Sequence, residues 1–357
     1  LKCDVGVMVT ASHNPPQDNG YKVYIGPSAD GISYAASQII SPTDKLIAEE
    51  IAAIKSLANQ PRGKSWTIIG EELISEYIRR TALIAPKPGD LKIVYTAMHG
   101  VGWNTLKSVF SNCGFTEPMA ALEQRDPDPA FPTVAFPNPE EKGALDIAIA
   151  LAESQKADVL IANDPDADRL AIAVPDSTGN WIALRGDQIG ALLGWWIIER
   201  ANLAGSKISG TFANSIVSSM LLEPIAKSAG LDYESTLTGF KWVSRVNNLV
   251  FGYEEALGYC IDPANVSDKD GISAAAVFME LIAHLQSVES TVWQVLDQLA
   301  NAYGLHVTDQ VSILVTSSEH VASTMLGIRT NPPNQLGKLQ VSGIDDLATG
   351  SGKLPAT

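Results

Sequence analysis

Three carboxylates stand at alternate positions of one short loop: Asp164, Asp166 and Asp168. The apolar run 157–162 leads directly into this loop and is typical of a buried strand. Along an extended loop, alternate side chains point the same way, so the three carboxylates can bring their oxygens to one point. Oxygen ligands of this kind are what Mg²⁺ prefers. The spacing therefore predicts a magnesium site, with an acidic solvated turn as the alternative.

Two other kinds of site also carry alternating acids. A calcium-binding EF-hand loop needs Gly at its sixth position and Glu at its twelfth, where this chain has Arg169 and Pro175. An aspartyl phosphatase also has a strand that ends in Asp-x-Asp, and it would use Asp164 as its nucleophile. That enzyme stays an alternative, although it would give no role to the serine loop near the start of the chain.

A serine and a histidine stand side by side at Ser12 and His13, in the polar loop 10–16 that follows the apolar stretch 5–9. A serine hydroxyl attacks only when a base or a metal ion activates its oxygen. The dipeptide alone is weak support, because adjacent side chains on an extended segment diverge. The loop predicts either a nucleophile or a simple polar turn.

Two acids and three cations stand in loops later in the chain. Glu254 and Glu255 follow a predicted strand, where they could accept hydrogen bonds from a polyhydroxy ligand or form an acidic pair at the surface. Lys241 and Arg245 follow a Thr-Gly turn, and Lys269 precedes a predicted helix. A lysine near a helix N-terminus can bind a phosphate or a sugar, or it can simply be solvated.

The chain reads as alternating strands and helices, a pattern that indicates parallel strands with helices packed on the sheets. We expect strands at 91–95, 157–162, 170–174, 208–212, 232–236, 249–252 and 311–315. We expect helices at 103–112, 138–155, 187–200, 216–230, 271–286 and 291–303. The expected domains cover residues 1–85, 86–186, 187–306 and 307–357. In doubly wound sheets ligands bind beyond the carboxyl ends of the strands, which is where these loops stand.

Taken together, the loops resemble those of the α-D-phosphohexomutase superfamily, the phosphoglucomutases and phosphomannomutases. The matching segments, in chain order, are TASHNP at 10–15, DPDADR at 164–169, TGFKW at 238–242 and YEEALGY at 253–259. They resemble, in turn, the family's phosphoserine, magnesium, specificity and sugar-binding loops. The last of them resembles the branch that also contains phosphopentomutases and glucose-1,6-bisphosphate synthases. The resemblance implies several α/β/α domains with mixed sheets around a central active-site cleft.

The resemblance also implies a role for each matching residue. The residues implied for catalysis are Ser12, His13, Lys22 and Arg169. Those implied to hold one Mg²⁺ ion are Ser12, Asp164, Asp166 and Asp168. Those implied to bind the substrate are Thr238, Gly239, Lys241, Glu254, Ala256 and Lys269. In this scheme Ser12 carries the phosphoryl group, and Lys22 is the candidate for proton transfer.

The resemblance leads us to expect a phosphosugar mutase that interconverts hexose 1-phosphate and hexose 6-phosphate, with glucose or mannose as the sugar. The phosphoryl group would pass through phosphoserine and a hexose 1,6-bisphosphate, which would also act as the activator. A phosphopentomutase, a hexose-bisphosphate synthase on the same fold and a non-catalytic sugar-phosphate-binding protein are the alternatives.

Two features depart from the family pattern. Many relatives have Ser at the position of Ala256 and His at that of Tyr259, which leaves the identity of the sugar open. The family's last domain carries an R-x-S-G-T-E phosphate loop that is absent after residue 306, and Ser-Gly-Thr at 209–211 lacks the flanking Arg and Glu. We therefore expect residues 307–357 to be the start of that domain, and part of the first domain to precede residue 1.

The composition is that of a folded protein, with 45% hydrophobic residues and a mean hydropathy of +0.06. A net charge of -15 disfavours binding to nucleic acid. Three widely spaced cysteines suggest neither a disulfide framework nor a zinc site. No apolar stretch is long enough to span a bilayer, and the first residues do not resemble a secretory signal. We expect a cytoplasmic monomer or homodimer that acts on a small-molecule sugar phosphate, without a nucleic acid or membrane partner.

Overall fold

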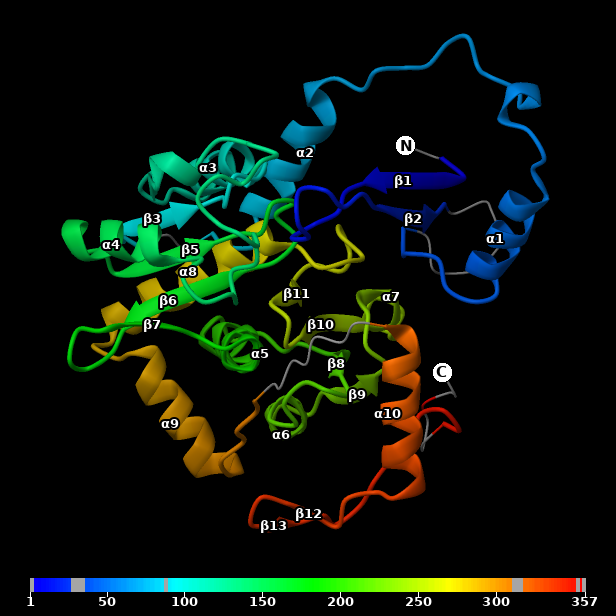
Figure 1. Ribbon diagram of the computed structural model, residues 1–357. Helices are drawn as coiled ribbons and strands as arrows, with labels where there is room; N and C mark the ends of the chain where they lie inside the picture. Colours follow the sequence, from blue (N-terminus) through cyan, green and yellow to red (C-terminus); the bar gives the residue numbers. More distant parts are fainter. Residues whose placement is uncertain (1–2, 27–35, 87–88, 310–316, 351–353, 355–357) are drawn as a thin grey trace. The chain divides into compact units, whose positions relative to one another are not determined.

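The computed structural model describes residues 3–26, 36–86, 89–309, 317–350 and 354. The chain forms two compact units, Leu1–His306 and Val307–Thr357, and Figure 1 follows it from blue to red. The described part of the first unit contains three sheets and most of the helices. The predicted fold class, α/β with mixed sheets, is confirmed.

A five-stranded mixed sheet carries the acidic loop. Its strands, in spatial order, are β4 (Met119–Ala120), β3 (Ile93–Thr96), β5 (Val159–Ala162), β6 (Ala171–Pro175) and β7 (Trp181–Ala183). β3 runs parallel to β4 and β5, whereas β6 runs antiparallel to β5 and β7. Parallel neighbours need a crossover of about a dozen residues or more, and the loop from β5 to β6 is shorter. The acidic loop is therefore a tight return between two buried strands.

A four-stranded sheet carries the loops that resemble the specificity and sugar-binding motifs. Its strands, in spatial order, are β11 (Gly258–Cys260), β10 (Leu249–Glu254), β8 (Thr211–Ser215) and β9 (Asp232–Thr236). β8 is parallel to both β9 and β10, and β11 is antiparallel to β10. The carboxyl ends of β9 and β10 consequently lie at the same edge of the sheet.

The serine loop joins the two strands of an antiparallel ribbon. These strands are β1 (Val5–Val9) and β2 (Tyr21–Ile25), with Val7 opposite Val23. An additional main-chain bridge pairs Tyr24 with Gln38. The sequence analysis did not identify β2, which carries the predicted site residue Lys22.

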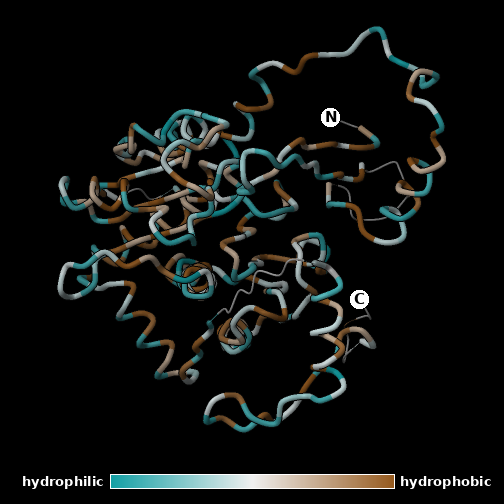
Figure 2. The backbone as a smooth tube through the Cα atoms, viewed as in Figure 1, coloured by the Kyte–Doolittle hydropathy of each residue, from teal (hydrophilic) through white to brown (hydrophobic). Residues whose placement is uncertain are grey.

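The helices of the first unit pack on its sheets or on one another, except the first, Thr43–Ala53, which has no buried residue. They are α1 (Thr43–Ala53), α2 (Glu71–Ala82), α3 (Gly102–Cys113), α4 (Asp146–Gln155), α5 (Gly186–Leu203), α6 (Leu222–Ser228), α7 (Phe240–Val243), α8 (Gly271–Ser287) and α9 (Val292–Tyr303). Short 3₁₀ turns lie at Leu57–Asn59 and Leu122–Gln124. Helix α8 is buried along most of its length and packs against α2, α3 and α5, so hydrophobic colour runs along it in Figure 2. Among the described residues no single helix could cross a membrane; α8 and α9 satisfy the length and hydropathy criteria only as a pair bent by 92°.

Several predicted elements need correction. The helix predicted over 138–155 begins only at Asp146, because Pro139 and the left-handed Gly143 (φ 85°) interrupt the preceding turns. The helix predicted over 216–230 is also shorter and begins at Leu222. The strand predicted over 208–212 begins at Thr211, as β8. The strand predicted over 311–315 lies outside the described residues.

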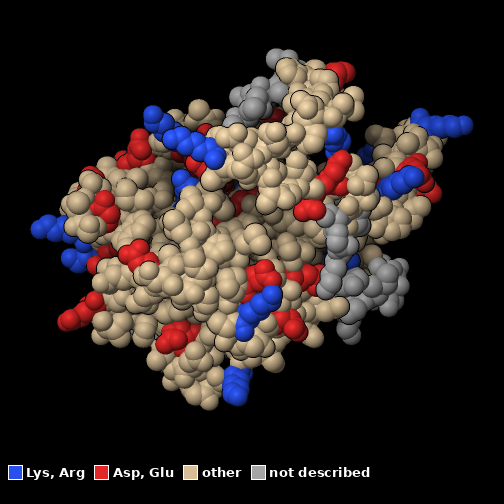
Figure 3. All heavy atoms as spheres, turned by 90° about the horizontal axis from the view of Figure 1, so that it is seen from below, with Lys and Arg blue, Asp and Glu red and all other residues tan. Residues whose placement is uncertain are grey.

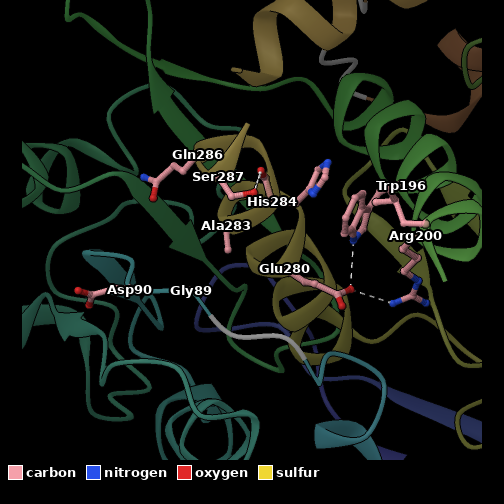
Figure 4. A pocket seen from close by; sticks show the side chains of 10 residues that line it. Gly89, Asp90, Trp196, Arg200, Glu280, Ala283, His284, Gln286 and Ser287 are labelled. Atoms are coloured by element: carbon pink, nitrogen blue, oxygen red, sulfur yellow. Dashed lines mark hydrogen bonds and ion pairs between the residues drawn. The ribbon is translucent and has the colours of Figure 1, made fainter. Parts of the chain in front are cut away.

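A buried carboxylate joins α5 to α8 (Figure 4). Glu280 on α8 accepts hydrogen bonds from Trp196 Nε1 at 3.1 Å and from Arg200 Nη1 at 3.2 Å, both on α5. Arg200 Nη1 also donates to the carbonyl of Ile84 at 2.8 Å, just after α2. The charge of Glu280 is thus matched inside the core, as a buried carboxylate requires. A cavity of about 500 Å³ beside this cluster is lined by none of the predicted site residues.

The second unit contains a helix and a hairpin in its described part. Helix α10 (Ser318–Thr330) precedes β12 (Gln335–Leu336), which pairs with β13 (Leu339–Gln340). Arg329 on α10 forms an ion pair with Asp346 at 3.0 Å. On the molecular face drawn in Figure 3, acidic and basic side chains are scattered among uncharged ones.

Candidate active site

The three acids of the 164–168 loop converge, as the spacing predicts. Asp164 is fully buried, and one carboxylate oxygen from each of Asp164, Asp166 and Asp168 lies within 4.8 Å of the others. Ala167 takes a left-handed conformation (φ 61°), and its N–H donates to the Asp164 carbonyl at 2.8 Å. The Arg169 N–H donates to Asp164 Oδ1 at 3.0 Å. The loop is therefore folded around the first of its carboxylates.

The serine hydroxyl meets these acids from the other end of the chain. Ser12 Oγ donates to Asp164 Oδ2 at 2.9 Å and lies 3.2 Å from Asp166 Oδ1. Ser12 itself is left-handed (φ 54°), a conformation that is unfavourable for a residue with a side chain. Thr10 helps to hold it, because Thr10 Oγ1 accepts the Ser12 N–H at 2.8 Å and donates to Asp166 Oδ2 at 3.0 Å. Thr10 was not among the predicted site residues, although it belongs to the TASHNP segment.

The acids repel one another, and the pKa values reflect this. Burial, followed by the charges of Asp168 and Asp166, raises the pKa of Asp164 well above its usual value. Burial also acts to raise the pKa of Asp166, but hydrogen bonding to Asp164 and the charge of Lys22 lower it overall. Among the described atoms, Asp168 Oδ1 is buried without a hydrogen-bond partner. Three clustered carboxylates, one with an unsatisfied oxygen, together with a serine oxygen form a donor set that fits Mg²⁺.

Three cations surround the acids. Lys22 Nζ lies 2.7 Å from Asp168 Oδ2, and Lys269 Nζ donates to the same oxygen. The Arg169 side chain lies 3.9 Å from Asp164 Oδ2. Burial opposes a charge on Lys22, but Asp168 and Asp166 raise its pKa above the usual value. The predicted cations Lys22, Arg169 and Lys269 are therefore brought to the acidic loop.

His13 lies beside the serine oxygen. Its Nδ1 atom is 3.1 Å from Ser12 Oγ and 4.0 Å from Asp164 Oδ2, and its ring meets that of Phe136 edge to face at 5.9 Å. Burial and the Arg169 guanidinium lower the pKa of His13 to about 4. The imidazole is thus neutral at pH 7 and, as the Nδ1–H tautomer, can donate a hydrogen bond to Ser12 Oγ, whose own proton goes to Asp164.

The sugar-loop residues form a second cluster connected to the first. Glu254 Oε1 accepts the Gly239 N–H at 2.6 Å, which joins the loops after β9 and β10. Arg169 Nη1 donates to the Ala256 carbonyl at 2.9 Å, so one guanidinium contacts both the acidic loop and the sugar loop. Burial raises the pKa of Glu254. Thr238 and Lys241 were also predicted to bind the substrate, and both lie within two residues of Gly239. In the described part of the chain, neither makes a hydrogen bond or an ion pair with Glu254, Arg169 or Ala256.

Glu255 and Tyr259 have structural partners of their own. Glu255 Oε2 accepts hydrogen bonds from Ser215 Oγ at 2.9 Å and from Ser218 Oγ at 2.8 Å. Tyr259 is fully buried, and its hydroxyl donates to the Gly186 carbonyl at 3.0 Å. These bonds fix both ends of the sugar loop against β8 and the start of α5.

Family models describe three successive parts of this architecture. The models for the α/β/α domains I, II and III of phosphoglucomutase/phosphomannomutase match residues 1–57, 74–179 and 185–303. A probable phosphomannomutase of Haemophilus influenzae is 46% identical over 348 residues, which are 96% of this chain and 70% of that protein. The chain belongs to the phosphoglucomutase/phosphomannomutase family.

Other members of the family are also similar to this chain. The human phosphopentomutase is 38% identical over 98% of this chain, which spans 61% of that protein. The crystal structure of a putative phosphomannomutase from Thermus thermophilus superposes with a TM-score of 0.66 at 21% identity, covering 85% of this chain and 64% of that one. At that identity the likeness supports the phosphohexomutase fold. The predicted superfamily is confirmed, and the chain spans only part of the length of these relatives.

Proposed function

We propose that the protein containing this chain is a magnesium-dependent phosphosugar mutase that interconverts the 1-phosphate and 6-phosphate of a hexose, glucose or mannose. Ser12 carries the phosphoryl group, and a hexose 1,6-bisphosphate is both intermediate and activator. The observation that carries the proposal is the placement of Ser12 Oγ at 2.9 Å from Asp164 and 3.2 Å from Asp166, among three cations. A hydroxyl in a phosphate-binding environment of this kind is suited to exchange a phosphoryl group.

One Mg²⁺ ion would be held by Asp164, Asp166, Asp168 and the oxygen of Ser12. When bound, it would draw negative charge from a phosphoryl oxygen and so ease transfer. The buried, unsatisfied Asp168 Oδ1 supports this assignment, because a carboxylate oxygen is rarely buried without a partner.

The transfer itself has two halves. In the first, the bond between phosphorus and Ser12 Oγ breaks while a bond to a free sugar hydroxyl forms, and the hydroxyl proton ends on Ser12. After the bisphosphate turns around, the second half reverses these changes with the other phosphate. Lys22 is the candidate to carry the proton, and Arg169 and Lys269 offset the phosphoryl charge. His13, in its Nδ1–H tautomer, can donate a hydrogen bond to the Ser12 oxygen and orient it.

Sugar recognition is assigned to the loops around Glu254. Its carboxylate is held by Gly239 N–H and can accept hydrogen bonds from sugar hydroxyls with its other lone pairs. Thr238, Lys241 and Ala256 complete the expected contacts, with Lys269 shared between phosphate and sugar.

A pentose phosphate is the second candidate substrate. The Ala256 side chain can make no hydrogen bond, and the Tyr259 hydroxyl is already bound to Gly186 inside the protein. The sugar loop thus has fewer side chains for hydroxyl recognition than the Ser- and His-containing form, which favours a smaller sugar or a less selective site. The similarity to the human phosphopentomutase points the same way.

We propose a cytoplasmic enzyme that is a monomer or homodimer and has no nucleic acid or membrane partner.

The test is a coupled assay of the full-length protein with Mg²⁺ and a trace of hexose bisphosphate. Glucose 1-phosphate, mannose 1-phosphate and ribose 1-phosphate are compared in parallel. Turnover of a hexose phosphate is the expected result. Turnover of ribose 1-phosphate alone would move the protein to the pentose branch, and no turnover of any would favour bisphosphate synthesis or a binding role.

A further inference from the structure

Two lysines converge on one carboxylate oxygen. Lys22 on β2 and Lys269 in the loop before α8 both donate to Asp168 Oδ2, the first at 2.7 Å. Their side chains retain only 21% and 10% of their surface exposure. Two ammonium groups that share one acceptor repel each other, and the repulsion is weakly screened in a partly buried site. Asp166, at 3.5 Å from Lys22 Nζ, offsets part of this repulsion, and the position of the pair also depends on how the two lysines are anchored.

Asp268 connects the two chain segments that carry these lysines. Its Oδ1 atom accepts the main-chain N–H of Lys269 at 2.8 Å, and its Oδ2 atom accepts the Tyr24 hydroxyl at 2.9 Å. Tyr24 stands two residues after Lys22 on β2, so the two side chains extend from the same face of the strand. The contacts close a ring from Asp168 through Lys22, β2, Tyr24, Asp268 and Lys269 back to Asp168. No member of this ring can move far without breaking a hydrogen bond.

The side-chain amide of Gln38 adds a hydrogen bond to the contact between Tyr24 and Asp268. Gln38 Nε2 donates to the same Asp268 Oδ2 atom at 3.2 Å, and the Gln38 main chain bridges Tyr24. Arg245 Nη2 donates to the Gln38 carbonyl at 2.8 Å. Burial and the charge of Asp268 raise the pKa of Tyr24, which keeps the phenol protonated as a donor. The link therefore reaches from the ribbon that carries Ser12 to the sheet that carries the sugar loop.

We propose that Asp268 is a positioning residue that holds the lysine pair, Lys22 and Lys269, against Asp168. It acts through hydrogen bonds, because its carboxylate accepts the Lys269 main-chain N–H and the Tyr24 hydroxyl. The catalytic consequence rests on the proposed mutase function: the two ammonium groups stay near the acids that bind Ser12 Oγ, where phosphoryl charge would develop. Lys22 Nζ lies 3.5 Å from Asp166, which itself contacts Ser12.

The direct test measures how readily each lysine is acetylated by acetic anhydride in the native protein, with peptides quantified by mass spectrometry. An ammonium held by hydrogen bonds to a carboxylate is protected from acetylation. In Asp268→Ala, acetylation of both Lys22 and Lys269 should accelerate about fivefold, as expected for the loss of roughly one hydrogen bond. The exposed Lys55 and Lys64 serve as internal references and should not change.

Three further variants sharpen the test. Tyr24→Phe removes only the hydroxyl and should also accelerate acetylation of both lysines, so it carries the test if Asp268→Ala fails to fold. Asp268→Asn keeps a carbonyl acceptor for Tyr24 and should restore most of the protection. Asp262→Ala, which removes a carboxylate that binds Asn265 in the same loop, is the matched control and should leave both lysines protected.

Unchanged acetylation of both lysines in Asp268→Ala, or in Tyr24→Phe, would overturn the proposal. Acceleration at Lys269 alone would also overturn it, because Asp268 would then order only its own loop. The acetylation rates do not depend on catalysis, so they can be read even if the full-length protein turns over no sugar phosphate. If it does, the kcat of Asp268→Ala should fall about fivefold in parallel with the lost protection, and Asp268→Asn should recover it.

Discussion

The hydroxyl oxygen of Ser12 lies 2.9 Å from Oδ2 of Asp164, although the two residues are 152 positions apart in the chain. Ser12 comes from a loop of the β1–β2 ribbon and Asp164 from the turn between β5 and β6 of another sheet. The contact unites a potential nucleophile with a potential metal site. It is the geometric basis of the proposed phosphoryl transfer.

Removal of the serine hydroxyl should abolish turnover. We expect Ser12→Ala in the full-length protein to lose about a thousandfold or more in kcat, as when a covalent nucleophile is removed. Its melting temperature should change little, because a part-exposed loop hydroxyl contributes little to stability. Ser108→Ala, which removes a partly exposed hydroxyl that donates to the Asn104 carbonyl within α3, is the matched control. Activity of Ser12→Ala near the wild-type level would rule out a phosphoserine mechanism.

Loss of one carboxylate should weaken the binding of Mg²⁺. Asp166→Asn is expected to bind Mg²⁺ about tenfold more weakly or worse in a calorimetric titration, because a charged ligand becomes neutral. Asp297→Asn makes the same change on the exposed face of α9 and should have no effect. Equal affinity in Asp166→Asn and wild type would place the ion elsewhere.

Phosphorylation of Ser12 should increase the affinity of the site for Mg²⁺. The unphosphorylated site balances the three acids with Lys22, Lys269 and Arg169. A divalent cation alone would add two positive charges, whereas phosphoserine alone would add about -1.5 to -2. We therefore expect phosphorylated protein to bind Mg²⁺ about tenfold more tightly than unphosphorylated protein, a typical coupling between two sites. Magnesium titrations of both forms test this, and identical affinities would refute the charge argument.

The guanidinium of Arg169 should be needed for its shape as well as its charge. Arg169→Lys keeps a positive charge but cannot contact both Asp164 and the Ala256 carbonyl. We expect kcat to fall about tenfold, as for the loss of one charge-assisted hydrogen bond. Steady-state kinetics of this variant, with Arg185→Lys at the start of α5 as the control, provide the measurement. Wild-type kcat in Arg169→Lys would show that charge alone suffices.

Most strands of the two larger sheets could be predicted from sequence because they are short runs bounded by turns, whereas the shorter strands β4, β7 and β11 were not identified. The run 157–162 is one example, and the alternating acids after it correctly indicated a clustered carboxylate site. The helix predicted over 138–155 is too long at its start, because Pro139 and the left-handed Gly143 interrupt the chain before Asp146. Proline removes a backbone donor and ends helical geometry locally, whatever the spacing of the side chains around it.

Long-range contacts could not be derived from local pattern. Nothing in the spacing of Tyr24 and Asp268 indicates that they meet, because the contact depends on how the ribbon packs against the later loop. The family resemblance implied separate roles for Lys22 and Lys269. The structure shows that both donate to the same oxygen, Asp168 Oδ2. Glu255 stood out as half of an acidic pair, but its two serine donors come from the end of β8 and the following turn.

The cysteines offer a check on the core. Burial raises the pKa of the Cys113 thiol to about 11, so at pH 8 only about one molecule in a thousand carries the reactive thiolate there. Cys260 is also buried, whereas Cys3 is exposed. A thiol reagent at pH 8 should therefore modify Cys3 first, and the other two only after unfolding. Equal rates at all three cysteines would contradict the described packing.

The most direct measurement is to locate the phosphate on the protein. Full-length protein is incubated with Mg²⁺ and a hexose 1,6-bisphosphate, then digested and analysed by mass spectrometry, under acidic conditions that also preserve an acyl phosphate. We expect a single phosphoryl group on Ser12 and, when it carries a ³²P label, transfer of the label to the sugar on addition of hexose 1-phosphate or hexose 6-phosphate. Phosphate on Asp164, no phosphate on Ser12 after incubation with the bisphosphate, or a label on Ser12 that does not pass to the sugar would show that Ser12 is not the phosphoryl carrier.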